Sequence, residues 1–101
     1  MRPLKRLEQL NTSDNLWVYI LKILEKSPTH AYAIRNEIEE LFGFRPGTMT
    51  AYKVLYLLRK EGLVSKTRDG RKRVYAITDR GRRELKAALK FYSGILKMLE
   101  K

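Results

Sequence analysis

Residues 48–77 read TMTAYKVLYLLRKEGLVSKTRDGRKRVYAI, and this stretch decides the fold of the chain. In its first half, apolar residues recur at the spacing of one helix face: Ala51, Val54, Leu55 and Leu58. Thr50 is a favoured N-cap, and Gly62 is a favoured residue just beyond a helix end. The first half therefore predicts a helix with one buried face.

The second half predicts a β-hairpin. Asp69-Gly70 separates two strand-like runs, and this dipeptide is typical of tight primed turns, which need positive φ angles. Five cations lie in or beside the turn: Lys66, Arg68, Arg71, Lys72 and Arg73. Their mutual repulsion disfavours such a cluster unless a polyanion offsets it. The alternative is that these cations only protect a sheet edge from aggregation.

A helix followed at once by a cationic hairpin predicts a winged helix-turn-helix that binds DNA. The fold class we expect is mainly α with a small β-hairpin (α+β), ending in a long C-terminal dimerisation helix. We divide the chain into an N-terminal amphipathic segment (1–12), a winged-helix domain (13–78) and the dimerisation helix (79–101).

The composition fits this interpretation. A length of 101 residues and a hydrophobic content of 44% favour one folded domain, and the net charge of +11 suits a polyanionic partner. The lack of cysteine excludes disulfides and thiolate metal sites and favours an intracellular protein. No apolar run approaches the roughly 20 residues of a membrane span, and no signal peptide is recognisable. We therefore expect a cytoplasmic, nucleoid-associated protein without a membrane partner.

The remaining elements are predicted from caps and apolar spacing. A helix follows the capping residues 11–15, a second helix runs from Thr29 to Gly43, and Thr78 caps the last helix. A seam of residues spaced by three and four runs along the last helix: Leu85, Leu89, Tyr92, Leu96 and Leu99. With Leu4 and Leu7 of the N-terminal segment, this seam is our candidate dimer interface. The alternatives are a seam packed on its own core and a frayed N-terminus.

The chain lacks the signals of an enzyme. It has no phosphate-cradling glycine-rich loop, no plausible metal cluster and no recognisable nucleophile–base pair. We expect neither a metal nor a cofactor. His30, the single histidine, is expected to make a hydrogen bond at a helix start or a phosphate contact.

The candidate DNA-binding residues fall into two groups. The groove-facing candidates are Thr48, Thr50, Tyr52, Lys53 and Tyr56, of which Lys53 is the strongest candidate to contact a base because lysine can donate to guanine acceptors. The phosphate-binding candidates are Arg45, Lys60 and the five hairpin cations, and such contacts position a protein without reading sequence.

With these elements placed, the chain resembles the PadR-like family of winged-helix transcriptional regulators. Four stretches carry the resemblance: PTHAYAI at 28–34, TAY with EGLV at 50–64, GRKRVYAIT at 70–78, and TDRGRR at 78–83. The resemblance implies a homodimer formed through the terminal helices, a pseudo-palindromic operator and usually repression. It also implies a possible small aromatic effector, since some members respond to phenolic or planar aromatic compounds.

The chain departs from the family pattern at the start of the recognition helix. Pro46-Gly47-Thr48 resembles the family's P-G-T but stands two residues early relative to Tyr52, which leaves Thr48 and Thr50 as alternative caps. The chain resembles the short members, which have one C-terminal helix. Two rival functions remain, namely a winged-helix protein-interaction module and a nonspecific, chromatin-like DNA binder.

Overall fold

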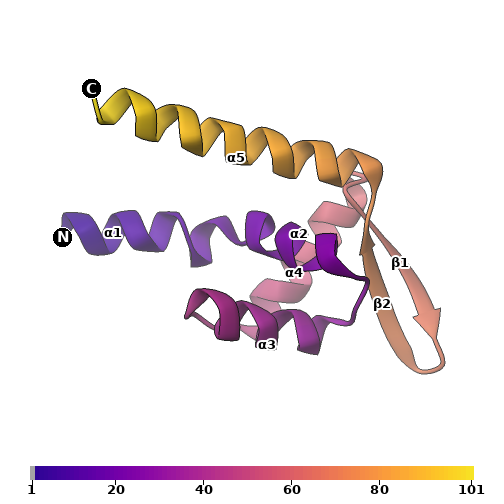
Figure 1. The fold of residues 1–101 in the computed structure, drawn as a ribbon. Coiled ribbons are helices and arrows are strands. Elements are labelled where there is room, and N and C mark those ends of the chain that lie inside the picture. Colours follow the sequence, from indigo (N-terminus) through magenta and orange to yellow (C-terminus); the bar gives the residue numbers. More distant parts are fainter. Residues whose placement is uncertain (1) are drawn as a thin grey trace.

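The computed structural model describes residues 2–101, which form a mainly helical fold with one two-stranded antiparallel hairpin (Figure 1). This architecture is the one predicted from the sequence. Its elements are α1 (Pro3–Leu10), a 3-10 turn η1 (Ser13–Asn15), α2 (Leu16–Lys26), α3 (Ala31–Phe42), α4 (Thr48–Lys60), β1 (Val64–Asp69), β2 (Lys72–Ile77) and α5 (Asp79–Leu99).

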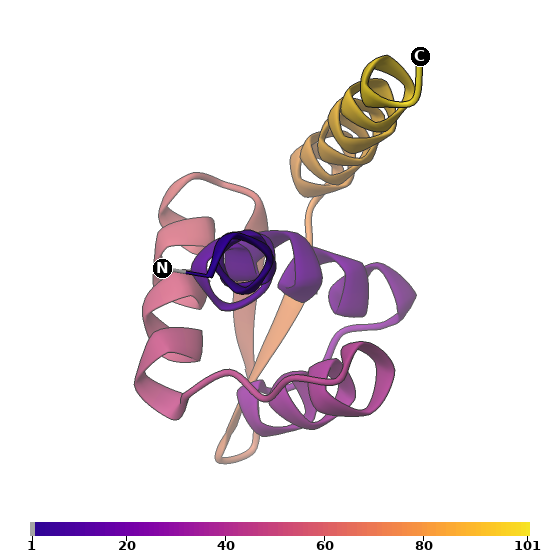
Figure 2. The ribbon, with the colours of Figure 1, turned by 90° about the vertical axis from the view of Figure 1, so that its left-hand side faces the viewer.

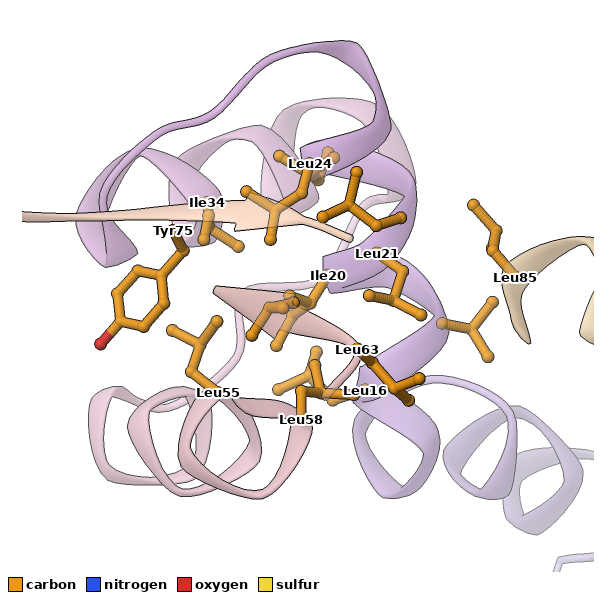
Figure 3. Close-up of a cluster of buried hydrophobic side chains, with 14 of the residues drawn as sticks. Leu16, Ile20, Leu21, Leu24, Ile34, Leu55, Leu58, Leu63, Tyr75 and Leu85 are labelled. Carbon is orange, nitrogen blue, oxygen red and sulfur yellow. The ribbon is translucent and has the colours of Figure 1, made fainter. Parts of the chain in front are cut away.

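Helix α2 is the centre of the core. Its side chains Ile20, Leu21 and Leu24 are fully buried because α3, α4, β2 and α5 pack around α2. Figure 3 shows these residues between Leu55 of α4 and Leu85 of α5. The core therefore fixes α3, α4 and the hairpin relative to one another through a single helix.

The second helix of the core, α3, begins at Ala31, so the prediction that Thr29 opens it was wrong. His30 is the N-cap, and its Nδ1 accepts a hydrogen bond from the backbone N–H of Ala33 at 3.4 Å, which confirms the predicted helix-start bond. Thr29 instead pairs with Tyr75 of β2 through two backbone hydrogen bonds of 3.0 and 2.8 Å. The entry to α3 is thus tied to the hairpin.

The start of α4 matches one of the two sequence alternatives, although its cap matches neither. The helix begins at Thr48 with Gly47 as its N-cap, and no side chain caps it. The first helical hydrogen bond runs from Ala51 N to Gly47 O at 2.9 Å, so Thr50 already lies inside the first turn. Neither Thr48 nor Thr50 is therefore the cap, because the extended residue Gly47 supplies the carbonyl oxygen that accepts the first helical hydrogen bond. The predicted end is confirmed, since Gly62 has φ +78° just beyond the helix.

The hairpin has a two-residue turn. Asp69 pairs with Lys72, so Gly70 and Arg71 are the central residues, and only Gly70 (φ +65°) has a positive φ. This pattern is that of a type II′ turn, in which glycine takes the first central position, rather than a turn with two positive φ angles. Because facing residues share one side of the pleat, Val64 and Ile77 direct the inner face of the hairpin toward the core.

The first turn of α5 lies tightly over the base of the hairpin. The Thr78 hydroxyl accepts a hydrogen bond from Gly81 N at 3.0 Å, which confirms Thr78 as the cap. A Cβ at Gly81 would stand 2.1 Å from the carbonyl oxygen of Leu63. Only glycine permits this crossing. One turn later, Leu85 is 1% exposed, so it is buried in the core of its own chain. The sequence analysis had placed Leu85 in the exposed seam of the dimer interface, and for this residue that expectation is wrong.

Helices α1 and α5 project from the same side of the core like the two prongs of a fork (Figures 1 and 2). The fork makes the molecule elongated, with principal extents of 51 × 29 × 22 Å. Leu4 and Leu7 of α1 are 67% and 56% exposed, and on α5 Leu96 and Leu99 are also exposed. Within residues 2–101 none of the helices combines the length and the apolar character that a membrane crossing requires.

Candidate nucleic-acid interface

The exposed face of α4 lies opposite its buried residues Ala51, Leu55 and Leu58. It carries Met49, Tyr52, Lys53, Tyr56 and Lys60, all exposed, at a spacing of three and four residues. Met49 is 84% exposed and was missed in the sequence analysis. Its position three residues before Tyr52 was the signal, since it falls on the same face as the predicted residues.

A cavity of about 370 Å³ opens beside this face, between α4, the start of α3 and the hairpin. Of the predicted DNA-binding residues, the structure brings Tyr52 and four hairpin cations together around it. The cavity is lined by His30, Ala31, Tyr32, Tyr52, Arg68, Arg71, Lys72, Arg73 and Tyr75. Four cations, three tyrosine rings and no carboxylate make its chemistry that of an anion site with aromatic walls.

The inner face of the hairpin concentrates unpaired positive charge. Arg68 stands directly opposite Arg73, an arrangement of like charges that destabilises a sheet. Among residues 2–101 the ion pairs are Lys22–Glu25 and Arg45–Glu39, so no hairpin cation has a carboxylate partner.

The crowding of positive charge on the hairpin affects the pKa of Lys66. Desolvation lowers the pKa of Lys66, and the guanidinium groups of Arg59, Arg73 and Arg68 lower it further. Arg59 of α4 therefore belongs to the same cationic surface, although the sequence analysis missed it. The signal was its place seven residues after Tyr52, which puts both on the flank of α4 that faces the hairpin.

Tyr75 forms part of the cavity wall. Its ring is buried, and burial raises the pKa of its hydroxyl, with Arg73 opposing the shift and Tyr52 adding to it. The hydroxyl is therefore protonated at neutral pH and can donate a hydrogen bond. A neutral donor among cations suits an oxygen-rich anion such as a phosphate diester.

Arg45 does not line the cavity beside the hairpin. Its guanidinium donates to Asn36 Oδ1 at 2.5 Å and pairs with Glu39 Oε1 at 3.2 Å, and it lies 5.7 Å from the centre of the Tyr32 ring. The predicted phosphate contact of Arg45 therefore stays a prediction, and without DNA its guanidinium is paired with Glu39. Asn36 and Glu39 of α3 hold the side chain.

The remaining predicted DNA-binding and dimer residues do not line the cavity beside the hairpin. Thr48 and Thr50 are exposed at the first turn of α4, and Lys60 is exposed at its last turn. Of the seam residues on α5, Leu89 is exposed and Tyr92 is half-buried, with its hydroxyl accepting a hydrogen bond from Asn15. The exposed apolar residues of α1 and α5 thus lie outside the cationic surface of the hairpin.

The comparisons with known proteins agree with this geometry. A PadR-like transcription factor of Bacteroides fragilis superposes with a TM-score of 0.79 at 18% identity, covering 94% of this chain and 96% of its own. The winged-helix DNA-binding protein F93 of STIV gives a TM-score of 0.72 at 16% identity, over 83% and 92% of the two chains. At these identities the likeness shows the fold, which is that of winged-helix DNA-binding proteins.

Sequence identity is higher for another solved structure. RosR of H. salinarum is 30% identical, with a TM-score of 0.67 and coverage of 75% of this chain and 70% of its own. No curated protein sequence matches the chain closely enough to count as a relative. The model of the transcriptional regulator PadR-like family matches residues 20–87, which run from α2 through the first turns of α5. Such regulators are not enzymes, and this chain belongs to the PadR-like family of transcriptional regulators.

Proposed function

We propose that the protein is a homodimeric, sequence-specific repressor that occupies a pseudo-palindromic operator in double-stranded DNA. The observation that carries this proposal is the exposed face of α4 beside a concave wall of unpaired cations. An α-helix fits the major groove of B-DNA, and flanking cations fit the phosphates on either side. Chromosomal DNA as the partner also places the protein in the cytoplasm, with the nucleoid.

Within each protomer the roles divide by position. Lys53 and Met49 lie opposite the core, so they would face the floor of the groove, where lysine donates to guanine and an apolar side chain contacts thymine methyls. Thr48, Thr50 and Tyr56 would border these contacts. Lys60, Arg59 and the hairpin cations would bind phosphates.

The dimer would form through the exposed apolar faces of the fork. Leu4 and Leu7 of α1 and Leu89, Leu96 and Leu99 of α5 are exposed apolar residues that their own chain does not cover. A two-fold pairing would place two α4 helices on successive major grooves, roughly 34 Å apart. Repression would follow because a dimer bound across a promoter excludes the transcription machinery.

Selection of bound fragments from random DNA, followed by a salt titration of the best fragment, tests the proposal. We expect a two-fold symmetric consensus and an affinity that falls steeply with salt, because about 6–10 phosphates would be neutralised per dimer. The variant Lys53→Ala should relax the consensus at one position per half-site by about 1–3 kcal/mol. The control Lys22→Ala removes one cation from α2 and should leave the consensus unchanged.

The same experiment separates the rival functions. Fragments without a consensus but with the same steep salt dependence would identify a nonspecific, chromatin-like binder. Weak binding that hardly depends on salt would identify a protein-interaction module.

A cavity of about 270 Å³ is the place we propose for a small aromatic effector. It lies between α2, the end of α3 and α5, and its walls include Tyr19, Phe42, Leu89 and Tyr92. Simple phenols should raise the melting temperature of the wild type, and Leu89→Trp, which fills the cavity, should abolish that shift. An equal shift in both proteins would exclude this cavity.

A further inference from the structure

The turn between α3 and α4, residues 43–47, is held against α3 by side chains of that helix. Arg35, which is half-buried, donates from Nε to the carbonyl oxygen of Pro46 at 3.0 Å, and Pro46 itself is buried. Figure 2 shows the connection passing across α3 on its way to α4. The segment directly before the exposed face of α4 is therefore fixed by α3, although it is neither helix nor strand.

Arg45 lies in this turn, and α3 binds its guanidinium through one nitrogen atom only. Nη1 donates to Asn36 Oδ1 at 2.5 Å and to Glu39 Oε1 at 3.2 Å. Within residues 2–101, the N–H groups on Nε and Nη2 of Arg45 make no hydrogen bond. The side chain is 30% exposed, so it is partly packed and still reached by solvent.

A phosphate is the ligand that the unused donors fit. The N–H groups on Nε and Nη2 point in parallel from the guanidinium plane, and such a pair can bind two phosphate oxygens at once. Ordering a long side chain on binding costs free energy, and this cost weakens many contacts made by surface arginines. In this protein the bonds from Nη1 already hold the side chain, so a phosphate would meet an oriented arginine.

Tyr32 connects Arg45 with the cationic cavity beside the hairpin. The Cζ atom of Arg45 lies 5.7 Å from the centre of the Tyr32 ring, and the same residue lines the cavity together with Arg68 and Arg73. A guanidinium over an aromatic ring is attracted to it, so the ring is a further support for the side chain. Arg45 thus lies at the border of the surface that we assign to DNA.

The contact with Glu39 also allows the opposite interpretation, in which α3 withholds Arg45 from DNA. Two observations favour presentation over withholding. The Glu39 side chain is 55% exposed, so solvent screens this ion pair and leaves it weak. The shorter hydrogen bond goes to Asn36, whose amide carries no charge and does not compete electrostatically with a phosphate.

We propose that Arg45 is a phosphate clamp at the entry of α4 and that Asn36 is the positioning residue that orients it. This inference rests on the proposed function and deepens it, because it gives α3 a role in DNA affinity. Glu39 and the Tyr32 ring complete the support of the guanidinium. Asn36 acts through Arg45 and needs no contact of its own with DNA.

Variants of Arg45 test the clamp, with operator affinity measured by fluorescence anisotropy at several salt concentrations. Arg45→Ala should weaken binding about 30-fold and reduce the slope of log K against log salt by about 2, because each protomer of the dimer loses one phosphate contact. Arg45→Lys keeps the charge but lacks the parallel donors, so it should keep the wild-type slope and still lose about 10-fold in affinity. The control Lys22→Ala removes another cation that is paired with a glutamate, and it should change neither quantity.

The variant Asn36→Ala tests the positioning role. It changes no charge, so it should weaken binding about 5-fold and leave the salt slope unchanged. In the Arg45→Ala background the same substitution should have no further effect, because Asn36 acts only through Arg45. Thermal melts check that the fold is kept, as expected for alanine on a helix.

The outcomes separate this inference from the proposed function. A wild type without salt-dependent binding to DNA would overturn both. If the wild type binds, a rise in affinity in Asn36→Ala would identify withholding and overturn only the clamp. An equal loss from Asn36→Ala with and without Arg45, an unchanged slope in Arg45→Ala, or wild-type affinity in Arg45→Lys would also overturn it.

Discussion

The two flanks of α4 carry opposite chemistry on one helix. On the hairpin flank, the adjoining cavity is lined by four cations and no carboxylate. On the far flank, away from the hairpin, an apolar groove of about 300 Å³ is lined by the carboxylates of Asp14, Glu61 and Glu84 and by no cation. The helical repeat of 3.6 residues makes this possible, because Tyr52 and Leu57 point to different sides although they lie within two turns. One helix can therefore border a cationic surface on one side and an acidic, apolar surface on the other.

Both flanks depend on the close contact of Gly81 in α5 with Leu63 and Ile77. A substitution that breaks this contact should have the largest effect on stability. Gly81→Ala forces the Leu63 carbonyl and the Ile77 side chain away from the new Cβ, and we expect a loss of about 3 kcal/mol in the free energy of unfolding. Chemical denaturation measures it. Gly94→Ala is the matched control, because its Cβ meets nothing within 4 Å and the change should stabilise α5 by up to about 1 kcal/mol. Equal effects at the two positions would contradict the tight crossing.

The second prediction separates the flanks by function. Arg68→Ala with Arg73→Ala should lower operator affinity by about 100-fold at physiological salt, about 2.7 kcal/mol, and should also reduce the slope of affinity against salt. Fluorescence anisotropy at several salt concentrations measures both. Glu61→Ala with Glu84→Ala changes the other flank, which carries no cation, and should lower affinity far less while leaving the slope against salt unchanged. A loss of similar size in both double variants would mean that the flanks are not independent.

A smaller effect of opposite sign should accompany the loss of affinity. Because Arg68 and Arg73 face each other across the strands, Arg68→Ala removes a repulsion and should raise stability by about 0.2–1 kcal/mol. Thermal melts at low salt should show the gain, and high salt should reduce it. A lower melting temperature at low salt would show that the repulsion is already relieved in the free protein.

The smallest effect is a dependence on alkaline pH. Burial raises the pKa of Tyr75 beside the hairpin and that of Tyr19 beside α5, where Tyr92 adds to the shift. The folded state therefore holds both protons more tightly than the unfolded state, so this stability is present below pH 10.0 and is lost as the pH rises above it. Melts of Tyr75→Phe and Tyr19→Phe should each fall less steeply than the wild type above pH 10.0. A wild-type slope in both variants would assign the alkaline loss to other groups.

The local features of this fold could be predicted from the sequence. The buried face of α4, the hairpin at Asp69-Gly70, the glycine ends at Gly43 and Gly62, and the cap at Thr78 depend on neighbours in the chain. Spacing and capping residues are sufficient to locate such features.

The features that were missed depend on how the elements pack. Arg45 pairs with Glu39 of α3, the helix that precedes it, and Leu85 is buried because α5 begins over the core before it projects. A stripe of apolar residues shows only that a face is covered, and it does not distinguish a core from a partner. The exposed residues that the sequence analysis omitted, Met49 and Arg59, lie on the predicted helix face, so counting the whole face would have included them.

The bridge between Thr29 and Tyr75 has a consequence for regulation. Because two backbone hydrogen bonds join the entry of α3 to β2, we expect the helix-turn-helix and the hairpin to move together as one unit, which we call the reading head. A signal cannot then be transmitted by swinging the hairpin away from α4 without breaking the sheet. We expect control to act on the distance and the angle between two intact heads, that is, on how far apart the protomers hold them relative to the pitch of DNA.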